Sequence, residues 1–294
     1  MVQILVVDNI NYSQLVTCGT VFQGTCQSRS LSNISLYETT VLPGVTYGFV
    51  ASTDPTHPAV AIVAPGPSSS TRLYVGTDEV LSEYVYKYVY YFRKYTCGVT
   101  SRYLSGDKIF QIPIPTGDGY LGTFAHLSEA AATSPHFLVN YVAGFSLEGF
   151  SYFLTTQPAV YPADNSSQLV SKLSQVCQED LLFDSYVEMQ IVCGTNTKNY
   201  NLVQAATLLQ PGTDLASTLG LNDTEHLLVA AFYGEPDSAL CVYRLSDIRR
   251  RFTENIQACY DSPLYSQPVG RQFFPNDKEQ YAYCAPDSQV GLLK

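Results

Sequence analysis

The sequence predicts an all-β fold made of many short strands. Residues that suit a half-buried pleated surface are abundant, with 23 Tyr and 14 Phe among 294 residues. Short apolar runs recur along the chain between Pro-Gly, Asp-Pro, Gly-Asp-Gly and Pro-Asp-Ser breakers. This pattern is typical of a sandwich, a barrel or a propeller. No strict sequence repeat is visible, so a WD40 array is not supported.

The predicted strands share an apolar or alternating pattern. They are residues 3–7, 14–17, 48–52, 59–64, 73–75, 110–114, 137–145, 150–156, 186–192, 202–208, 227–233 and 239–243. Residues 84–95 alternate Tyr with Val and Lys, which predicts a strand with one tyrosine-rich face. Such a face occurs in ordinary packed strands and is also favoured at interfaces, because Tyr buries an apolar ring and keeps a polar tip.

One segment has the spacing of an amphipathic helix. In residues 246–260, Ile248, Phe252 and Ile256 follow one another every four positions, and Ser246 is a candidate N-cap. The three arginines that follow Ile248 would then form a solvated face rather than a binding patch.

The charge pattern excludes some partners. The formal net charge is −10, and 14% of the residues are charged, against roughly 25% in an average domain. The arginines at 249–251 form the one dense basic run. Nucleic acid and anionic lipid surfaces are therefore not expected as partners, because both are bound through basic patches. A net negative charge is typical of a soluble secreted domain.

The cysteines and the glycosylation sequons indicate an oxidising compartment. Eight cysteines stand at positions 18, 26, 97, 177, 193, 241, 259 and 284, and no two form a C-x-x-C pair. A structural zinc site and a thioredoxin-type redox site are therefore not expected, whereas disulfides are. Four N-x-S/T sequons predict glycosylation at Asn11, Asn33, Asn165 and Asn222.

The start of the chain predicts a strand rather than a signal peptide, since residues 1–8 have no basic start and too short an apolar run. No window reaches the roughly 18 apolar residues of a membrane-spanning helix. We therefore expect a fragment of a longer secreted-type chain, with no direct membrane insertion of this segment.

Motifs of catalysis are not found in the sequence. It has no P-loop, no dinucleotide-binding glycine pattern, no H-E-x-x-H and no G-x-S-x-G. The four histidines, His57, His126, His136 and His226, are not spaced as metal ligands. A glycosidase-type carboxylate pair stays open, because 26 acidic residues offer many pairs in space. We expect no enzyme, no cofactor and no metal site.

A cysteine loop near the start carries a family resemblance. Cys18-Gly-Thr-Val-Phe-Gln-Gly-Thr-Cys26 resembles the first-blade cysteine loop of plexin sema domains, and scatter-factor receptor tyrosine kinases have a similar loop. Semaphorins have a different variant, so the chain resembles the receptor side. Leu31-Ser-Asn-Ile-Ser35 resembles plexins as well, the B-type above all.

Further blocks resemble the family in the same order. They are Phe150-Ser-Tyr-Phe-Leu-Thr-Thr-Gln157, Leu173-Ser-Gln-Val-Cys177, Ser185-Tyr-Val-Glu-Met-Gln-Ile-Val-Cys193, Asn201-Leu-Val-Gln-Ala-Ala206, Pro211-Gly212, and the stretch from Ser238-Ala-Leu-Cys-Val-Tyr243 to Ile256-Gln-Ala-Cys-Tyr260. Gln190 stands where the family has a proline, and residues 76–130 match poorly. The resemblance covers most of the chain.

The resemblance implies a fold and a domain division. Sema domains are seven-bladed β-propellers of four-stranded blades. At roughly 40–50 residues per blade, residues 1–294 would be an incomplete sema domain, from the end of blade one to about blade five. A helix in the extrusion would fall within about 245–294. Residues 169–177 have helical spacing by themselves, but the family implies a strand there.

The resemblance also implies disulfide pairs. It pairs Cys18 with Cys26 and Cys193 with Cys241. It would give Cys177 and Cys259 partners beyond residue 260, where only Cys284 is available. The run after Cys284 resembles the segment that holds the partner of Cys177, which implies Cys177–Cys284. Cys259 is then unpaired or paired with Cys97.

The function implied is protein recognition. The chain would be an extracellular ligand-binding region of a semaphorin receptor, a single-pass glycoprotein at the outer face of the cell membrane in signal transduction and axon guidance. Its partners would be a semaphorin and, further, a receptor homodimer or a co-receptor. The alternative is the ectodomain of a scatter-factor-type receptor tyrosine kinase that binds a growth factor. That class carries a basic cleavage site where this chain has Gly194-Thr-Asn-Thr-Lys-Asn-Tyr200, which favours the plexin alternative.

Overall fold

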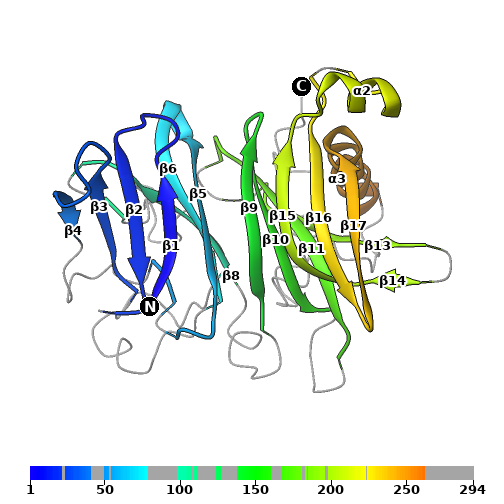
Figure 1. The fold of residues 1–294 in the computed structure, drawn as a ribbon, viewed down its shortest axis with the longest axis horizontal. Helices are drawn as coiled ribbons and strands as arrows, with labels where there is room; N and C mark the ends of the chain where they lie inside the picture. The colour runs from blue at the N-terminus through cyan, green and yellow to red at the C-terminus, as the bar shows by residue number, and fades with distance from the viewer. Residues whose placement is uncertain are drawn as a thin grey trace.

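In the described part of the computed structural model, four antiparallel β-sheets of three or four strands stand side by side in chain order (Figure 1). The structure describes residues 1–21, 24–40, 50–52, 54–78, 98–106, 109–110, 124–126, 138–159, 167–180, 183, 185–195, 198–222 and 224–261. Within this part the chain is mostly β, with two α-helices and one short 3-10 helix, η1 (Pro67–Ser69).

Each of the first three sheets has four strands that pair with their neighbours in sequence. The first sheet contains β1 (Val2–Val7), β2 (Gln14–Gly19), β3 (Cys26–Ser30) and β4 (Tyr37–Thr40). The second contains β5 (Ala59–Gly66), β6 (Ser70–Thr77), β7 (Gly98–Tyr103) and β8 (Phe124–His126). The third contains β9 (Asn140–Leu147), β10 (Phe150–Pro158), β11 (Leu169–Cys177) and β12 (Val187–Ile191).

The fourth sheet has three strands among the residues that the structure describes. These are β15 (Leu202–Leu209), β16 (Leu227–Gly234) and β17 (Asp237–Arg244). A two-stranded hairpin of β13 (Cys193–Gly194) and β14 (Asn199–Tyr200) precedes them. Helix α2 (Thr213–Leu219) lies between β15 and β16, and α3 (Leu245–Asp261) follows β17.

The first strands of the four sheets, β1, β5, β9 and β15, lie beside one another in that order. Each sheet therefore presents its first strand to its neighbours and carries the later strands outward (Figure 1). Because consecutive strands pair in meanders, each sheet is one continuous stretch of chain.

Three hydrophobic clusters fill the spaces between successive sheets. The first joins Ile4 and Val16 of the first sheet to Leu73 and Val75 of the second. The next lies between the second and third sheets, where the Tyr141 and Phe153 rings meet edge-on at 6.1 Å. The third, the largest, lies between the third and fourth sheets. Sheet-on-sheet burial is therefore the main source of stability in this arrangement.

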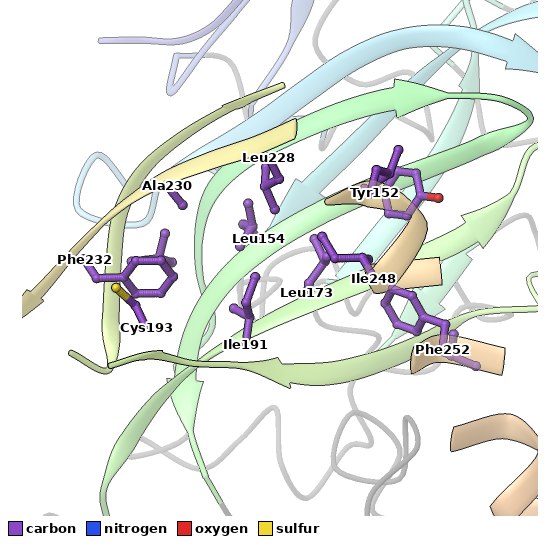
Figure 2. Packing of buried hydrophobic residues seen from close by; sticks show 13 residues of the cluster. Tyr152, Leu154, Leu173, Ile191, Cys193, Leu228, Ala230, Phe232, Ile248 and Phe252 are labelled. Carbon is purple, nitrogen blue, oxygen red and sulfur yellow. The ribbon is translucent and has the colours of Figure 1, made fainter. Parts of the chain in front are cut away.

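The third cluster also contains one face of α3 (Figure 2). Ile248 and Phe252 of the helix lie close to Leu173 of β11, and all three side chains are buried. The predicted helix over residues 246–260 is therefore confirmed, together with its apolar face. At 17 residues, α3 is held mainly by this packing rather than by intrinsic helix propensity.

Residues 169–177 form the strand β11, as the resemblance implied and against their local periodicity. β11 lies inside the third sheet between β10 and β12, and both of its faces are buried. A strand that is covered on both sides needs no alternation of polar and apolar residues, so the usual period of two is lost.

The other predicted strands agree with the structure to different degrees. Ten of the predicted ranges overlap observed strands, mostly within a few residues. Of the predicted strand 48–52, residues 48–49 lie outside the described part of the chain and residues 50–52 form no strand. Phe110 sits in a turn with φ 64°. Residues 84–95, with their tyrosine-rich pattern, and residues 111–114 lie outside the described part of the chain.

An ion pair lies inside the third sheet. Lys172 of β11 donates to a carboxylate oxygen of Glu188 of β12 at 2.6 Å, and the two side chains are 4% and 1% exposed. Neighbouring Tyr186 is buried as well, which raises the pKa of its hydroxyl group. A pair this deep in the sheet is costly to break from one side, because the remaining charge would be buried alone.

Candidate recognition surface

Two disulfides fix strand ends in the structure. Cys18 of β2 faces Cys26 of β3 in register, with their Cα atoms 4.1 Å apart, and the bond closes the turn between the strands. Cys193 of β13 is joined to Cys241 of β17 across 48 residues of sequence. These are the two pairs that the resemblance implied. The second bond ties the β13–β14 hairpin to the fourth sheet.

The remaining cysteine predictions are not settled by the described residues. Cys177 ends β11, is half-buried and forms no disulfide with another described cysteine. Its predicted partner Cys284 lies outside the described residues, as do Cys97 and the side chain of Cys259. The pairing of Cys177 with Cys284 stays a prediction.

Three of the four sequons lie on exposed turns. Asn11 is in the β1–β2 turn, Asn33 is in the β3–β4 turn, and Asn222 follows α2. Asn165 lies outside the described residues. The Asn11 amide nitrogen already donates to Asp8 Oδ2 at 3.0 Å and to Thr71 Oγ1 at 3.2 Å. The exposed turns leave all three asparagines on the surface, and among the described residues only Asn11 has its amide nitrogen bound to other side chains.

The first sheet carries an apolar rim beside two of these sequons. The β1–β2 and β3–β4 turns meet where the Leu31 N–H donates to the Ser13 carbonyl at 3.0 Å. Their exposed side chains, which we call the first-sheet rim, are Ile10, Tyr12, Leu31, Ile34 and Leu36. An exposed apolar cluster of this kind is a feature of recognition surfaces, although glycans at Asn11 and Asn33 would lie next to it.

Both outermost sheets expose an apolar face. On the first sheet, Leu5 and Val7 point away from the second sheet and are 67% and 41% exposed. On the fourth sheet, Tyr233, Leu240 and Val242 point away from the third sheet, and Leu240 is 69% exposed. We call these surfaces the first end face and the fourth end face.

Helix α3 begins on a cap that comes from another element. Ser246, the predicted cap, uses its hydroxyl group to donate to Glu225 Oε2 at 2.7 Å. Glu225 Oε1 accepts the Ser246 N–H at 3.3 Å and the His226 N–H at 3.2 Å. The Glu225 carboxylate therefore satisfies the start of the helix, and the prediction that Ser246 caps it was wrong.

The arginines of α3 divide into two kinds. Arg250 and Arg251 are 60% and 67% exposed and pair with acidic residues of their own helix. Arg249 is 27% exposed and donates to Tyr152 Oη at 3.1 Å and to the Leu147 carbonyl at 3.2 Å, and it also pairs with Glu148. The solvated face predicted for all three is thus wrong for Arg249, which docks α3 onto the β9–β10 hairpin.

A buried carboxyl group lies between the second and third sheets. Asp78, directly after β6, is 7% exposed, and its Oδ2 accepts the Val139 N–H at 2.8 Å just before β9 begins. Burial raises the pKa of Asp78 to about 6. Sequence patterns did not single out Asp78, because an acidic residue after a strand usually belongs to a solvated turn.

Metal-ligating side chains do not gather in the described residues. No group of three or more His, Cys, Asp and Glu there could hold a metal ion. His57 Nδ1 lies 3.9 Å from Asp54 Oδ2 in an exposed turn, and His226 directly precedes β16. In the same part of the chain, no helix is both long and apolar enough to cross a membrane. The described surface is thus one of exposed apolar rims, end faces and polar turns.

Known proteins share both the sequence and the fold. No family model matches the chain. Plexin-A4 of Mus musculus is 39% identical over 145 residues, which cover 45% of this chain and 8% of the relative. Plexin-A3 of Homo sapiens is 30% identical over 278 residues, which cover 86% of this chain and 14% of the relative. The chain therefore spans only a small part of the length of these curated relatives.

Solved structures agree with these relatives. The full extracellular region of plexin A4 superposes with a TM-score of 0.71 at 26% identity, over 88% of this chain and 29% of that one. Extracellular domains 1–2 of Drosophila Semaphorin 1a superpose with a TM-score of 0.52 at 18% identity, over 85% of this chain and 42% of that one. At that identity, the second likeness concerns the fold alone.

These findings define a mostly β protein of several antiparallel sheets with a sema-like fold. The chain is a homologue of the plexin extracellular region, and its similarity is to A-type plexins, Plexin-A4 and Plexin-A3 among them. The B-type subclass suggested by residues 31–35 is not supported. A five-residue segment carries too little information to separate subclasses that share one fold.

Proposed function

We propose that this chain is part of the ligand-binding extracellular region of a plexin-like semaphorin receptor. The observation that carries the proposal is the similarity to the plexin A4 extracellular region over 88% of the chain. The receptor would be a single-pass protein with this region at the outer face of the plasma membrane. Signal transduction would then belong to other parts of the receptor.

The arrangement of the sheets supports a partial propeller. Three four-stranded meanders and one three-stranded sheet follow in chain order, with β1, β5, β9 and β15 side by side. Radial sheets whose first strands are neighbours are the construction principle of a β-propeller. Residues 1–294 would form an incomplete sema domain, from the end of blade one to about blade five, with α3 in the extrusion.

The two end faces support the same proposal. Each carries exposed Leu and Val side chains on the side where a further sheet of a ring would stack. Apolar side chains of this kind are normally buried when two sheets pack face to face. The end faces are therefore assigned to blade stacking, which leaves the turns and the outer strands for ligand recognition.

Protein recognition fits the chemistry of the remaining surface. The described residues combine apolar rims with polar turns, as protein interfaces do, and the net charge of −10 disfavours nucleic acid. The partner proposed is a semaphorin, and a receptor homodimer or a co-receptor would be a further one. Recognition needs no cofactor and no catalytic residue.

The test is a binding measurement on the complete ectodomain that contains this chain. The ectodomain is immobilised, and semaphorin ectodomains and a scatter-factor-type growth factor are passed over it by surface plasmon resonance. We expect saturable binding of at least one semaphorin and none of the growth factor. Binding of the growth factor alone, or of neither class by a folded ectodomain, would overturn the proposal.

A further inference from the structure

A polar pocket lies where three elements meet, at the end of the sheets where Figure 1 shows α2. Its volume is about 170 Å³. Glu148 comes from the β9–β10 turn, Asn222 and Thr224 from the loop after α2, and Ser246 and Arg249 from the start of α3. A ligand in this pocket would touch the third sheet, the loop and the helix together.

The polar groups of the pocket are held in place by the fold. Glu225 is fixed by three hydrogen bonds from Ser246 and His226, with lengths of 2.7, 3.3 and 3.2 Å. Arg249 is fixed by Tyr152 and the Leu147 carbonyl. His226 Nδ1 lies 3.1 Å from the Thr224 carbonyl, so the tautomer that donates there leaves Nε2 as an acceptor. Pre-oriented donors and acceptors suit a hydroxyl-rich ligand such as a sugar.

The pocket wall contains an attachment point for a sugar. Asn222 and Thr224 are the first and third residues of the sequon Asn222-Asp-Thr224, and both line the pocket. Asn222 is exposed, and its side-chain amide makes no hydrogen bond with the described residues. The amide nitrogen is therefore available for substitution without loss of a contact.

The sequon at Asn11 provides the contrast. Its amide nitrogen donates two hydrogen bonds, to Asp8 and to Thr71. A glycosylated amide nitrogen keeps one hydrogen, so both bonds cannot persist. Asn33 is different again, because its Oδ1 accepts the Ser35 N–H at 3.1 Å in an open turn. Asn222 thus combines an amide nitrogen that makes no hydrogen bond to the described residues with a polar pocket at its side.

We propose that Asn222 carries an N-linked glycan whose first N-acetylglucosamine occupies this pocket and fastens α3 to the loop and the third sheet. The glycan comes from a lipid-pyrophosphate-linked oligosaccharide. The Asn222 Nδ2–C1 bond forms, the bond from C1 to the phosphate oxygen breaks, the amide gives up one proton, and the lipid pyrophosphate leaves. The proposal rests on the proposed extracellular function, because this transfer takes place in the secretory pathway.

The experiment uses the complete ectodomain secreted from glycosylating cells. Glycopeptide mass spectrometry measures the occupancy of each sequon, and thermal unfolding measures Tm. Thr224→Ala removes the Asn222 sequon, Thr224→Ser keeps it, and Asn33→Gln removes the sequon in the exposed β3–β4 turn. We expect high occupancy at Asn222, a Tm lower by about 2–4 °C for Thr224→Ala, and no shift for Thr224→Ser or Asn33→Gln.

Enzymatic trimming separates the first sugar from the rest of the glycan. An endoglycosidase that leaves one N-acetylglucosamine should preserve Tm, whereas an amidase that removes the whole glycan should lower it as Thr224→Ala does. Asn222→Asp serves as the control for the carboxylate that the amidase leaves. Protein made without glycosylation should show no difference between wild type and Thr224→Ala, which excludes a direct structural effect of Thr224.

Two results would overturn the proposal. One is an unoccupied Asn222 in secreted protein. The other is an equal effect of Thr224→Ala and Asn33→Gln on Tm, since the pocket would then contribute nothing. Failure of semaphorin binding with Asn222 occupied and Thr224→Ala destabilised would remove the proposed ligand and leave the sugar site standing.

Discussion

Several charged side chains have structural roles that their residue type alone does not predict. Asp78, Arg249 and Glu225 look like solvated charged residues in the sequence, yet each joins two elements in the structure. Asp78 bridges the second and third sheets, Arg249 docks α3, and Glu225 caps it. Such residues give the sharpest tests of the architecture, because exposed residues of the same type elsewhere in the chain serve as controls.

Asp78 makes stability depend on pH. Its folded pKa of about 6 lies above its ordinary value of 3.8, so the fold favours the protonated form. The stability that this preference contributes is present below pH 3.8 and is lost as the pH rises through 6. Asp78→Asn keeps an oxygen for the Val139 N–H and has no charge to bury.

We therefore expect Asp78→Asn to raise the free energy of unfolding near pH 7.5 by up to about 3 kcal/mol and to change it little near pH 4. Urea denaturation at the two pH values measures this. Asp54→Asn, in an exposed turn, is the control and should give no gain at pH 7.5. An equal effect of Asp78→Asn at both pH values would show that its carboxyl group is not desolvated.

Arg249 and Arg250 are adjacent in the sequence and differ in their partners. Arg249→Ala removes hydrogen bonds to Tyr152 and Leu147 from a half-buried site and should lower the free energy of unfolding by about 1.5–3 kcal/mol. Arg250→Ala removes only exposed pairs within α3 and should lower it by less than about 1 kcal/mol. Urea denaturation of both variants measures the two losses in the free energy of unfolding. Equal losses would mean that α3 is not docked through Arg249.

At the scale of elements, each sheet is a separate meander, and two disulfides and helix α3 add links within and between these elements. Cys18–Cys26 closes a single turn within the first sheet, whereas Cys193–Cys241 joins the β13–β14 hairpin to β17. Helix α3 covers the third cluster beside the three described strands of the fourth sheet. The two disulfides therefore differ in the length of chain that each one closes into a loop.

The two disulfides should differ in their contribution to stability. Their sequence separations are 8 and 48 residues, and the entropy of the unfolded chain falls more when a longer loop is closed. Replacing both Cys193 and Cys241 by Ala should cost about 1.6 kcal/mol more than replacing Cys18 and Cys26. Guanidinium unfolding of the two double variants measures the difference. A larger loss for the Cys18 and Cys26 variant would contradict the loop-entropy argument.

At the scale of the whole molecule, the two end faces set the behaviour of the chain when it is produced alone. In the chain produced alone, these faces would leave Leu5, Val7, Leu240 and Val242 exposed to water. Between the inner sheets of the molecule, the corresponding faces pack against each other. Exposed apolar faces of this kind promote association. The first end face of one copy can stack on the fourth end face of another, since each is a β-sheet surface with aliphatic side chains.

We expect the isolated chain to self-associate with increasing concentration. Replacing Leu240 and Val242 by Lys should suppress this association, because charges on the fourth end face oppose sheet stacking. Light scattering after size-exclusion chromatography gives the mass at several concentrations. Leu215→Lys, which removes an exposed apolar side chain on α2 away from this face, is the control and should leave the association unchanged. If the chain with Lys at positions 240 and 242 still associates, the surface that drives association is not the fourth end face.

The sequence by itself determined the β class, the position of α3 and the plexin resemblance, and that resemblance implied the cysteine pairs 18–26 and 193–241. These features depend on local information: short apolar runs, a four-residue spacing, and cysteines with recognisable neighbours. Asn222 was also predicted as a glycosylation site, because a sequon is written in three adjacent residues.

The tertiary structure alone decided the rest. β11 is a strand in spite of its spacing because sheets cover both of its faces, and β3, with the polar sequence CQSRS, is a strand because β2 and β4 pair with it. The roles of Asp78, Arg249 and Glu225, and the pocket beside Asn222, arise from residues distant in sequence. Burial and pairing between distant segments are properties of the assembled sheets, and local sequence patterns do not contain them.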